Sequence, residues 1–164
     1  HLEGLVRTLE TATGQTPRRA AKRTILPGSI CNHPEIYDIV ENAGADVVWD
    51  ELCTGSRFFE GPIDEDGDPL AAIARRYMNR MNCPAKHKDL RSRGETLVRM
   101  AQDHAAGGVI FLNFKFCEPH AFDYPYLKEM LQARGVPSLL LEIDQELPAS
   151  GQLATRIEAF IETM

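Results

Sequence analysis

No apolar run in the sequence approaches the length of a membrane-spanning helix, and basic residues are in the minority. Eighteen Lys and Arg residues against 24 Asp and Glu residues give a formal net charge of -6 at pH 7. A negatively charged chain is repelled by the phosphate groups of nucleic acids and by anionic lipid surfaces. We therefore expect neither a nucleic acid nor a membrane among its partners.

Cysteine is scarce as well, with four residues at irregular spacing. No signal-like apolar segment follows a basic N-terminal end, so we expect a cytoplasmic, reducing setting with free or metal-binding thiols rather than a disulfide framework. The sequence begins with His1 and ends with Met164 inside a helical pattern, which is typical of a fragment or a processed half of a longer protein.

The sequence does contain enough apolar residues for one core, since 43% of its 164 residues are hydrophobic and 26% are charged. Residues 1–22 predict the tail of a helix and a linker, and residues 23–164 predict a single α/β domain. Short apolar runs alternate with helical patterns, which favours a doubly wound parallel sheet, flavodoxin-like or Rossmann-like, with right-handed crossovers. The predicted strands are RTIL at 23–26, DVVW at 46–49, VIFL at 109–112 and SLLL at 138–141.

Two of the predicted helices flank the loops of interest. The segment DEDGDPLAAIARRYM predicts a helix with one buried face, and the helix after the third strand is expected to begin at Asp123 or Tyr124. The acidic residues 64–68 have a spacing suggestive of calcium ligands. They lack the later bidentate Glu of an EF-hand, so a solvated loop and helix N-cap is favoured. The helix predicted from DEDGDPLAAIARRYM is expected to bury Leu70, Ile73, Ala74, Tyr77 and Met81.

Cysteines follow two of the predicted strands, Cys53 in DELCTG and Cys117 in FKFCEPH. Because the carboxyl ends of parallel strands meet at one sheet edge, where ligands bind, we expect these two thiols to border one crevice. Cys83 falls between two helices, so we expect it to lie away from that crevice. A small buried apolar residue is the alternative interpretation of Cys53 and Cys31, whereas Cys117 has polar neighbours that do not belong to a core.

A zinc site is a further alternative for the same residues. Cys83 with His87, and Cys117 with His120, resemble pairs of zinc ligands. The gap between the pairs and the interruption at Pro84 match no usual zinc module, so the sequence disfavours zinc.

Four segments carry a resemblance to a known family. They are DELCTGSRFFEG, the break at residues 82–84, GGVIFLNFKFCEPHAFDYPYLKE and PSLLLEIDQELPASGQLATRIEAF. From about Arg23 to Met164 the sequence resembles the C-terminal half of one polypeptide of the 2-hydroxyacyl-CoA dehydratase and benzoyl-CoA reductase family.

The resemblance implies an oxygen-sensitive enzyme of anaerobic metabolism. Each subunit would have two α/β domains with a 4Fe-4S cluster between them, and would pair with a second family subunit around an acyl-CoA thioester. An ATP-hydrolysing iron-sulfur activator would inject one low-potential electron. The substrate would then form a ketyl radical anion that eliminates water or, in the reductase branch, an aromatic ring would accept electrons.

The resemblance also implies roles for individual residues. Cys117 matches the cluster ligand that the family's C-terminal domain supplies, with Lys115 and backbone amides moderating the charge of the thiolate, and Cys53 matches a frequent family cysteine at the same edge. The missing N-terminal half would bring the remaining ligands, so we expect no intact 4Fe-4S cluster in this chain alone. Two alternatives stay open, namely a double-cubane cluster reductase acting on small non-CoA substrates and a non-catalytic binding or assembly domain.

Overall fold

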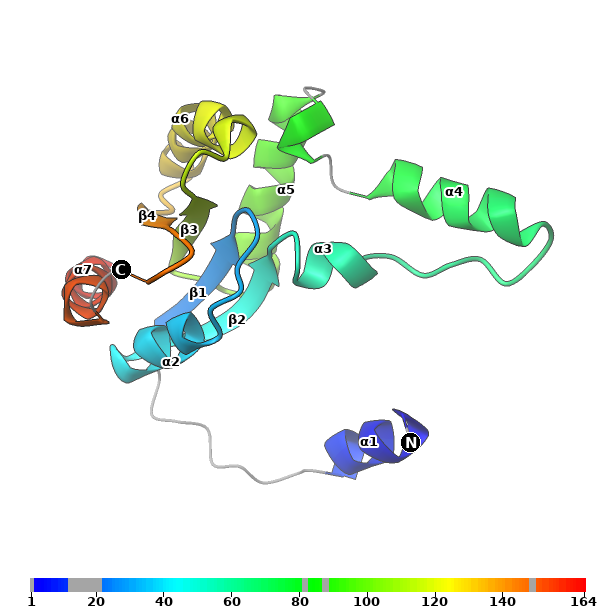
Figure 1. The fold of residues 1–164 in the computed structure, drawn as a ribbon, viewed down its shortest axis with the longest axis horizontal. Coiled ribbons are helices and arrows are strands. Elements are labelled where there is room, and N and C mark those ends of the chain that lie inside the picture. The colour runs from blue at the N-terminus through cyan, green and yellow to red at the C-terminus, as the bar shows by residue number, and fades with distance from the viewer. Residues whose placement is uncertain (1, 12–21, 81–82, 87–88, 148–149) are drawn as a thin grey trace.

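A computed structural model describes residues 2–11, 22–80, 83–86, 89–147 and 150–164 (Figure 1). The linker predicted before the domain lies in large part outside these residues. In chain order the elements are α1 (Leu2–Thr11), β1 (Lys22–Pro27), α2 (Glu35–Asn42), β2 (Ala45–Glu51), α3 (Ser56–Phe59), α4 (Pro69–Asn79), the 3-10 helix η1 (Pro84–Lys86), α5 (Leu90–Asp103), β3 (Gly108–Phe114), α6 (Glu118–Gln132), β4 (Ser138–Ile143) and α7 (Ser150–Glu162).

The apolar runs form one parallel sheet. Among the described residues it has four strands in the order β2-β1-β3-β4, and every neighbouring pair is parallel. Each strand is followed by at least one helix, so the predicted doubly wound α/β domain is confirmed.

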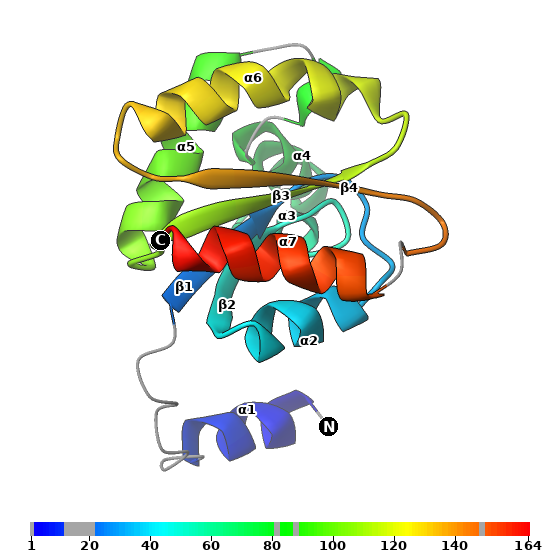
Figure 2. The same ribbon diagram turned by 90° about the vertical axis from the view of Figure 1, so that its left-hand side faces the viewer.

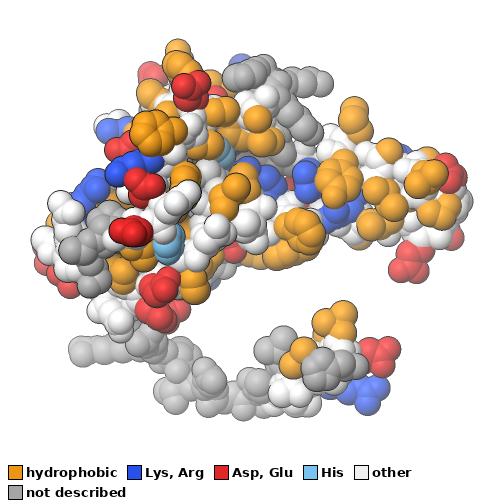
Figure 3. Space-filling model, viewed as in Figure 1, with side chains coloured by type: hydrophobic (Ala, Val, Ile, Leu, Met, Phe, Trp, Pro, Cys, Tyr) orange, Lys and Arg blue, Asp and Glu red, His pale blue; other side chains and the backbone are white. Residues whose placement is uncertain are grey.

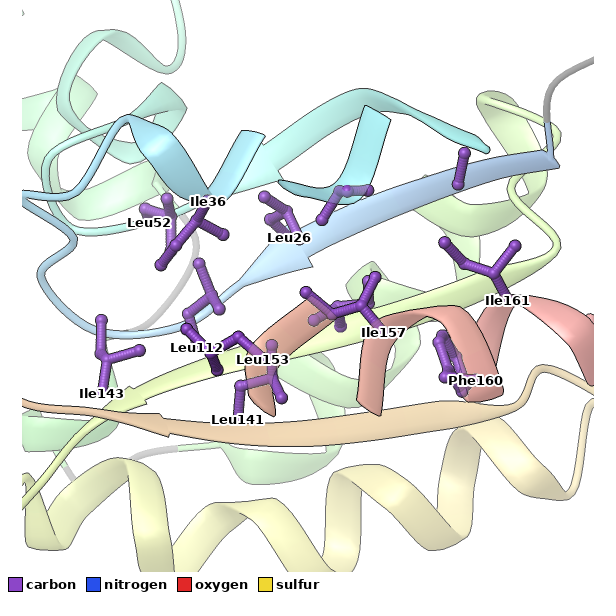
Figure 4. Packing of buried hydrophobic residues seen from close by; sticks show 13 residues of the cluster. Leu26, Ile36, Leu52, Leu112, Leu141, Ile143, Leu153, Ile157, Phe160 and Ile161 are labelled. Atoms are coloured by element: carbon purple, nitrogen blue, oxygen red, sulfur yellow. The ribbon is translucent and has the colours of Figure 1, made fainter. Parts of the chain in front are cut away.

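Helices cover both faces of the sheet (Figures 1 and 2). Helices α2 and α7 pack on one face against a cluster of buried aliphatic side chains that includes Leu26, Leu112 and Leu141 (Figure 4). Helices α5 and α6 pack on the other face around Ile25 and Phe111. Burying apolar area on both faces is the main source of stability for such a sheet.

The strand order places a switch point between β1 and β3. The chain leaves β1 toward β2 on one side and later returns to pair β3 with the other side of β1. Directly after β1, Gly28 bridges to Leu112 within β3 so closely that a Cβ atom at Gly28 would overlap the Leu112 carbonyl. Because β1 leads to α2 on one face of the sheet and β3 leads to α6 on the other face, the loops after these strands diverge, and ligand crevices form at such a point.

Two expectations about the helices are wrong. Leu70, Ile73, Ala74 and Tyr77 are exposed, because α4 projects away from the sheet (Figures 1 and 3); the predicted burial of Met81 lies outside the described residues. Helix α6 begins at Glu118 rather than near residue 123, since the ring of Pro119 suits the first turn of a helix.

The acidic segment before α4 is the N-cap that the sequence favours. The Asp68 carboxylate accepts hydrogen bonds from the amides of Leu70 and Ala71, at 3.2 and 3.3 Å. None of the helices in the described part of the chain is long and apolar enough to cross a membrane.

Candidate functional site

A pocket of about 660 Å³ lies at the carboxyl ends of the strands. Five segments contribute lining residues: Ser29, Ile30, Asn32 and His33 after β1, Cys53 after β2, residues 114–117 with Pro119 and His120 around the end of β3, Gln145 after β4, and Cys83 and Ala85 around η1. Most of its wall is apolar. Separate segments that follow all four strands, together with the η1 segment, thus build one crevice at the switch point of the sheet.

Three thiols line this crevice within the described residues: those of Cys53, Cys83 and Cys117. The prediction that Cys53 and Cys117 share one crevice is confirmed. The prediction that Cys83 lies away from it is wrong, because η1 packs against α6 and carries the preceding residue to the strand-end edge. Cys31 instead packs against the cluster beneath α2, and its Sγ lies 3.6 Å from the His33 carbonyl oxygen.

The loop that carries Cys53 is held by the carboxylate of Asp50. Asp50 Oδ1 accepts hydrogen bonds from the amides of Ser56 at 2.7 Å and Leu52 at 3.3 Å. A Cβ atom at Gly55 would overlap this carboxylate, so a larger residue there would displace the Asp50 side chain from its hydrogen bonds. The sequence DELCTGS therefore closes a compact loop before α3 and fixes where the Cys53 side chain starts.

Arg57 directs a buried guanidinium at the Cys53 thiol. Its Nη1 lies 3.1 Å from Cys53 Sγ, its Nη2 donates to the Glu51 carbonyl at 3.0 Å, and its Nε pairs with the Glu51 carboxylate. Burial works to lower the pKa of Arg57, but the Glu51 carboxylate beside it raises the pKa overall. Arg57 therefore carries a permanent positive charge next to Cys53.

Burial raises the pKa of the Cys53 thiol, although Arg57 works in the opposite direction. The thiol is consequently favoured over the thiolate at neutral pH. Lys115 also lines the crevice, and its Nζ lies 3.1 Å from Asp144 Oδ2, so its ammonium is paired with that carboxylate.

Cys117 stands at the N-cap position of α6, after a tight turn. Its amide donates to the Phe114 carbonyl at 3.0 Å, and Phe116 between them has a positive φ of 66°. Such a backbone conformation is uncommon for an aromatic residue and is concentrated at functional sites. The turn brings Cys117 to the crevice and places its thiol at the positive end of the α6 dipole.

His120 lies on the same wall, one turn further into α6, and only 4% of its surface is exposed. Arg93 Nη2 lies 3.3 Å from its Nδ1, and Nε2 has no hydrogen-bond partner among the described residues. Burial, with the nearby Arg93 and Arg57 charges, lowers the pKa of His120 to about 3. The contact of Nδ1 with a guanidinium argues against the zinc pair considered from the sequence; His87 lies outside the described residues.

The buried charges were not anticipated as part of the site. Glu51, Arg57 and Arg93 are all buried, and Arg93 Nη1 also pairs with Asp123 Oδ2 at 2.7 Å. The burial of Arg93 is predictable from the sequence, because Arg93 precedes Leu97 by four residues and so falls on the same inward face of the helix. In the described segments, no group of three or more Cys, His, Asp or Glu side chains is arranged to hold a single metal ion.

Comparison with known proteins gives one family and several relatives. Residues 1–164 match the family model described as 2-hydroxyglutaryl-CoA dehydratase, D-component. The chain is 32% identical over 143 residues to the (R)-phenyllactyl-CoA dehydratase beta subunit of Clostridium sporogenes, covering 87% of this chain and 38% of that protein. It is 28% identical over 144 residues to the lactoyl-CoA dehydratase beta subunit of Anaerotignum propionicum, with 87% and 38% covered.

A relative from the reductase branch also matches. Identity to one of the benzoyl-CoA reductase subunits of Thauera aromatica is 27% over 143 residues, which covers 85% of this chain and 36% of that protein. The chain therefore spans less than half the length of the curated relatives it matches.

Proposed function

Because this chain belongs to the 2-hydroxyglutaryl-CoA dehydratase D-component family, we propose that its crevice is one wall of a site for a 4Fe-4S cluster in an acyl-CoA dehydratase or reductase. The observation that carries the proposal is the convergence of Cys53, Cys83 and Cys117 on one pocket from three separate loops. Thiolates are the ligands that iron-sulfur clusters require.

The donor set of the crevice fits such a cluster. A 4Fe-4S cluster takes about four thiolates, one at each iron, so its ligands stand further apart than those of one metal ion. This agrees with thiols that line one pocket of about 660 Å³ without forming a single-ion site among the described residues. The apolar wall favours the burial of a cluster, because it limits access of water.

Cys117 and Cys53 are the ligands that the family resemblance favours, and the structure adds Cys83 as a candidate. Arg57 would offset negative charge at Cys53, because its Nη1 already lies 3.1 Å from Sγ. Glu51 would hold Arg57 in that position through the paired carboxylate. The remaining ligand and the opposite wall would come from an N-terminal half of the same polypeptide.

The names of these three relatives each include a CoA thioester, which supports an acyl-CoA substrate for the whole protein. A bound cluster would supply single low-potential electrons there, received from an ATP-dependent iron-sulfur activator. Two of the relatives are called beta subunits, and this supports a second family subunit as partner. Within this scheme the present chain anchors the cluster and shields it from water.

The test is the iron content of the full-length protein, purified without oxygen and together with its partner. Cys117→Ser should lower the iron content and abolish activity, and Cys83→Ser should lower the iron content as well. Cys31→Ser is the matched control, because Cys31 packs against the core outside the crevice, and it should retain the iron. Iron unchanged by Cys117→Ser would show that Cys117 is not a ligand.

A further inference from the structure

His120 faces the crevice with one ring nitrogen engaged and one unpaired. Arg93 Nη2 lies 3.3 Å from Nδ1. A guanidinium has donors and no acceptor, so Nδ1 must be the unprotonated nitrogen that accepts this hydrogen bond. The single proton of the neutral ring is therefore on Nε2, which is buried and has no acceptor among the described residues.

Arg93 is held rigidly in the position that fixes this tautomer. Its side chain is 2% exposed, its Nη1 donates to Asp123 at 2.7 Å, and its Nη2 lies 3.8 Å from Glu51 Oε2. Helices α5 and α6 also pack tightly at this point, since a Cβ atom at Gly94 would overlap the Met130 sulfur. The distance between Arg93 and His120 is thus set by the packing of two helices.

The ring also stays neutral over the physiological pH range. Burial and the adjacent guanidiniums of Arg93 and Arg57 lower the pKa of His120 to about 3. The Nε2–H group is consequently a fixed, uncharged donor on the wall that also carries Cys53, Cys83 and Cys117.

We infer that His120 is a positioning residue whose Nε2–H donates a hydrogen bond to a sulfur atom at the occupied site, either a ligand thiolate or a cluster sulfide. This inference rests on the proposed function. A buried donor without an acceptor is costly, and an electron-rich sulfur supplies the missing acceptor once the crevice is filled. Arg93 acts through His120 by keeping the proton on Nε2, the ring nitrogen that has no partner among the described residues.

The other crevice histidine provides a contrast. His33 Nε2 lies 3.1 Å from the Asp144 carbonyl oxygen, which can only accept, so this nitrogen already donates to the backbone. His33 therefore has no free Nε2–H to offer, although it lines the same pocket. Substituting each histidine in turn separates the loss of a free donor from the loss of a ring.

A donor to sulfur stabilises the reduced, more negative form of a cluster and raises its reduction potential. The experiment is an EPR-monitored redox titration of the full-length anaerobic protein with its iron content measured in parallel. His120→Phe keeps an aromatic ring but has no donor, so its midpoint potential should shift to a more negative value. His120→Gln retains an amide donor and should show a smaller shift, and His33→Gln should show none.

The outcomes separate this inference from the proposed function. A wild-type protein that holds no iron would overturn both the proposed function and the role of His120. A wild-type protein with full iron, together with a His120→Phe variant of unchanged iron content and unchanged potential, overturns only the role of His120.

If His120→Phe loses its iron, its midpoint potential cannot be measured, and the inference is tested on the wild-type protein instead. With 15N-labelled histidine, the reduced cluster should show a histidine nitrogen hyperfine coupling that persists in His33→Gln. No such coupling in iron-loaded wild-type protein overturns the inference.

Discussion

Helices α5 and α4 have the same kind of apolar periodicity in the sequence but lie in opposite surroundings. The apolar face of α5 packs under the sheet, where Leu97 is 0% exposed, whereas Leu70 at the start of α4 is 77% exposed. Figure 1 shows α5 beside α6 on the same face of the sheet, and α4 extending away from both. Helical periodicity thus identifies an apolar face but does not reveal what covers it.

The two helices are also held by different interactions. Helix α4 is tied back by arginines: Arg76 donates to the Gly61 and Phe58 carbonyls at 2.8 and 2.9 Å, and Arg80 donates to the Arg57 carbonyl at 3.0 Å. Helix α5 is held by buried aliphatic contacts and by Arg93, which joins it to α6. Hydrophobic burial should therefore dominate the stability of α5, and exposed polar contacts that of α4.

The largest expected effect comes from truncating one leucine in each helix. Leu97→Ala should lower the free energy of unfolding by about 2–5 kcal/mol, because it leaves a cavity in a fully packed site. Leu70→Ala should change it by less than about 0.5 kcal/mol, because this side chain is exposed. Chemical denaturation of both variants measures the difference, and equal losses would contradict the contrast between the helices.

A second expected effect depends on pH and on the contact of α5 with His120. The pKa of His120 is lowered to about 3 in the folded chain, from an ordinary value of 6.5. Between pH 3 and pH 6.5 the unfolded state binds a proton at this histidine that the folded state does not bind. The contribution of the neutral ring to the free energy of unfolding is therefore fully present above pH 6.5 and is lost as the pH falls toward 3. The loss between pH 6.5 and pH 4 should be about 3 kcal/mol from this group alone.

The measurement is the free energy of unfolding of the chain at a series of pH values from 4 to 7. His120→Gln should be less stable at pH 7 and should have a flatter pH dependence. His104→Gln is the control, because this ring stacks on Trp49 with centroids 4.8 Å apart, away from the crevice. An unchanged slope in His120→Gln would mean that carboxylates, not His120, set the acid sensitivity.

Much of the fold follows from the sequence, since four apolar runs separated by helical patterns have few solutions other than a parallel sheet covered on both faces. The strand ends also place Cys53 and Cys117 correctly, because carboxyl ends of parallel strands share one edge. Cys83 could not be placed in this way. It lies in a connection between two helices, and the sheet does not determine the path of such a connection.

The polar half of the crevice was harder to anticipate than its thiols. Arg57 follows Cys53 by four residues and would ordinarily be interpreted as a surface side chain. It is buried only because Glu51, at the end of β2, offers a carboxylate in the same place. The pairing depends on the loop between them, whose shape is set by Asp50 and Gly55 and has no simple periodic signature.

The smallest expected effect compares the N-caps of the two helices. Asp89 accepts a hydrogen bond from the Ser92 amide at 3.1 Å at the start of α5, and Asp68 caps α4 in the same manner. Each carboxylate satisfies amides that have no partner within the helix, so replacing either by Ala should cost about 1 kcal/mol. For α5 this cost should lower the global free energy of unfolding, whereas for α4 it should lower only the local stability of the helix.

Hydrogen exchange of the amides in residues 69–79, together with chemical denaturation, distinguishes the two cases. Asp68→Ala should weaken the protection of these amides about fivefold and change the global free energy of unfolding by less than about 0.5 kcal/mol. Asp89 adopts a left-handed backbone with a φ of 61°, so Asp89→Asn is the matched control, because Asn keeps a side-chain acceptor and tolerates this conformation. If Asp68→Ala lowered global stability as much as Asp89→Ala, α4 would unfold together with the sheet, and the two helices would share one cooperative unit despite their different exposure.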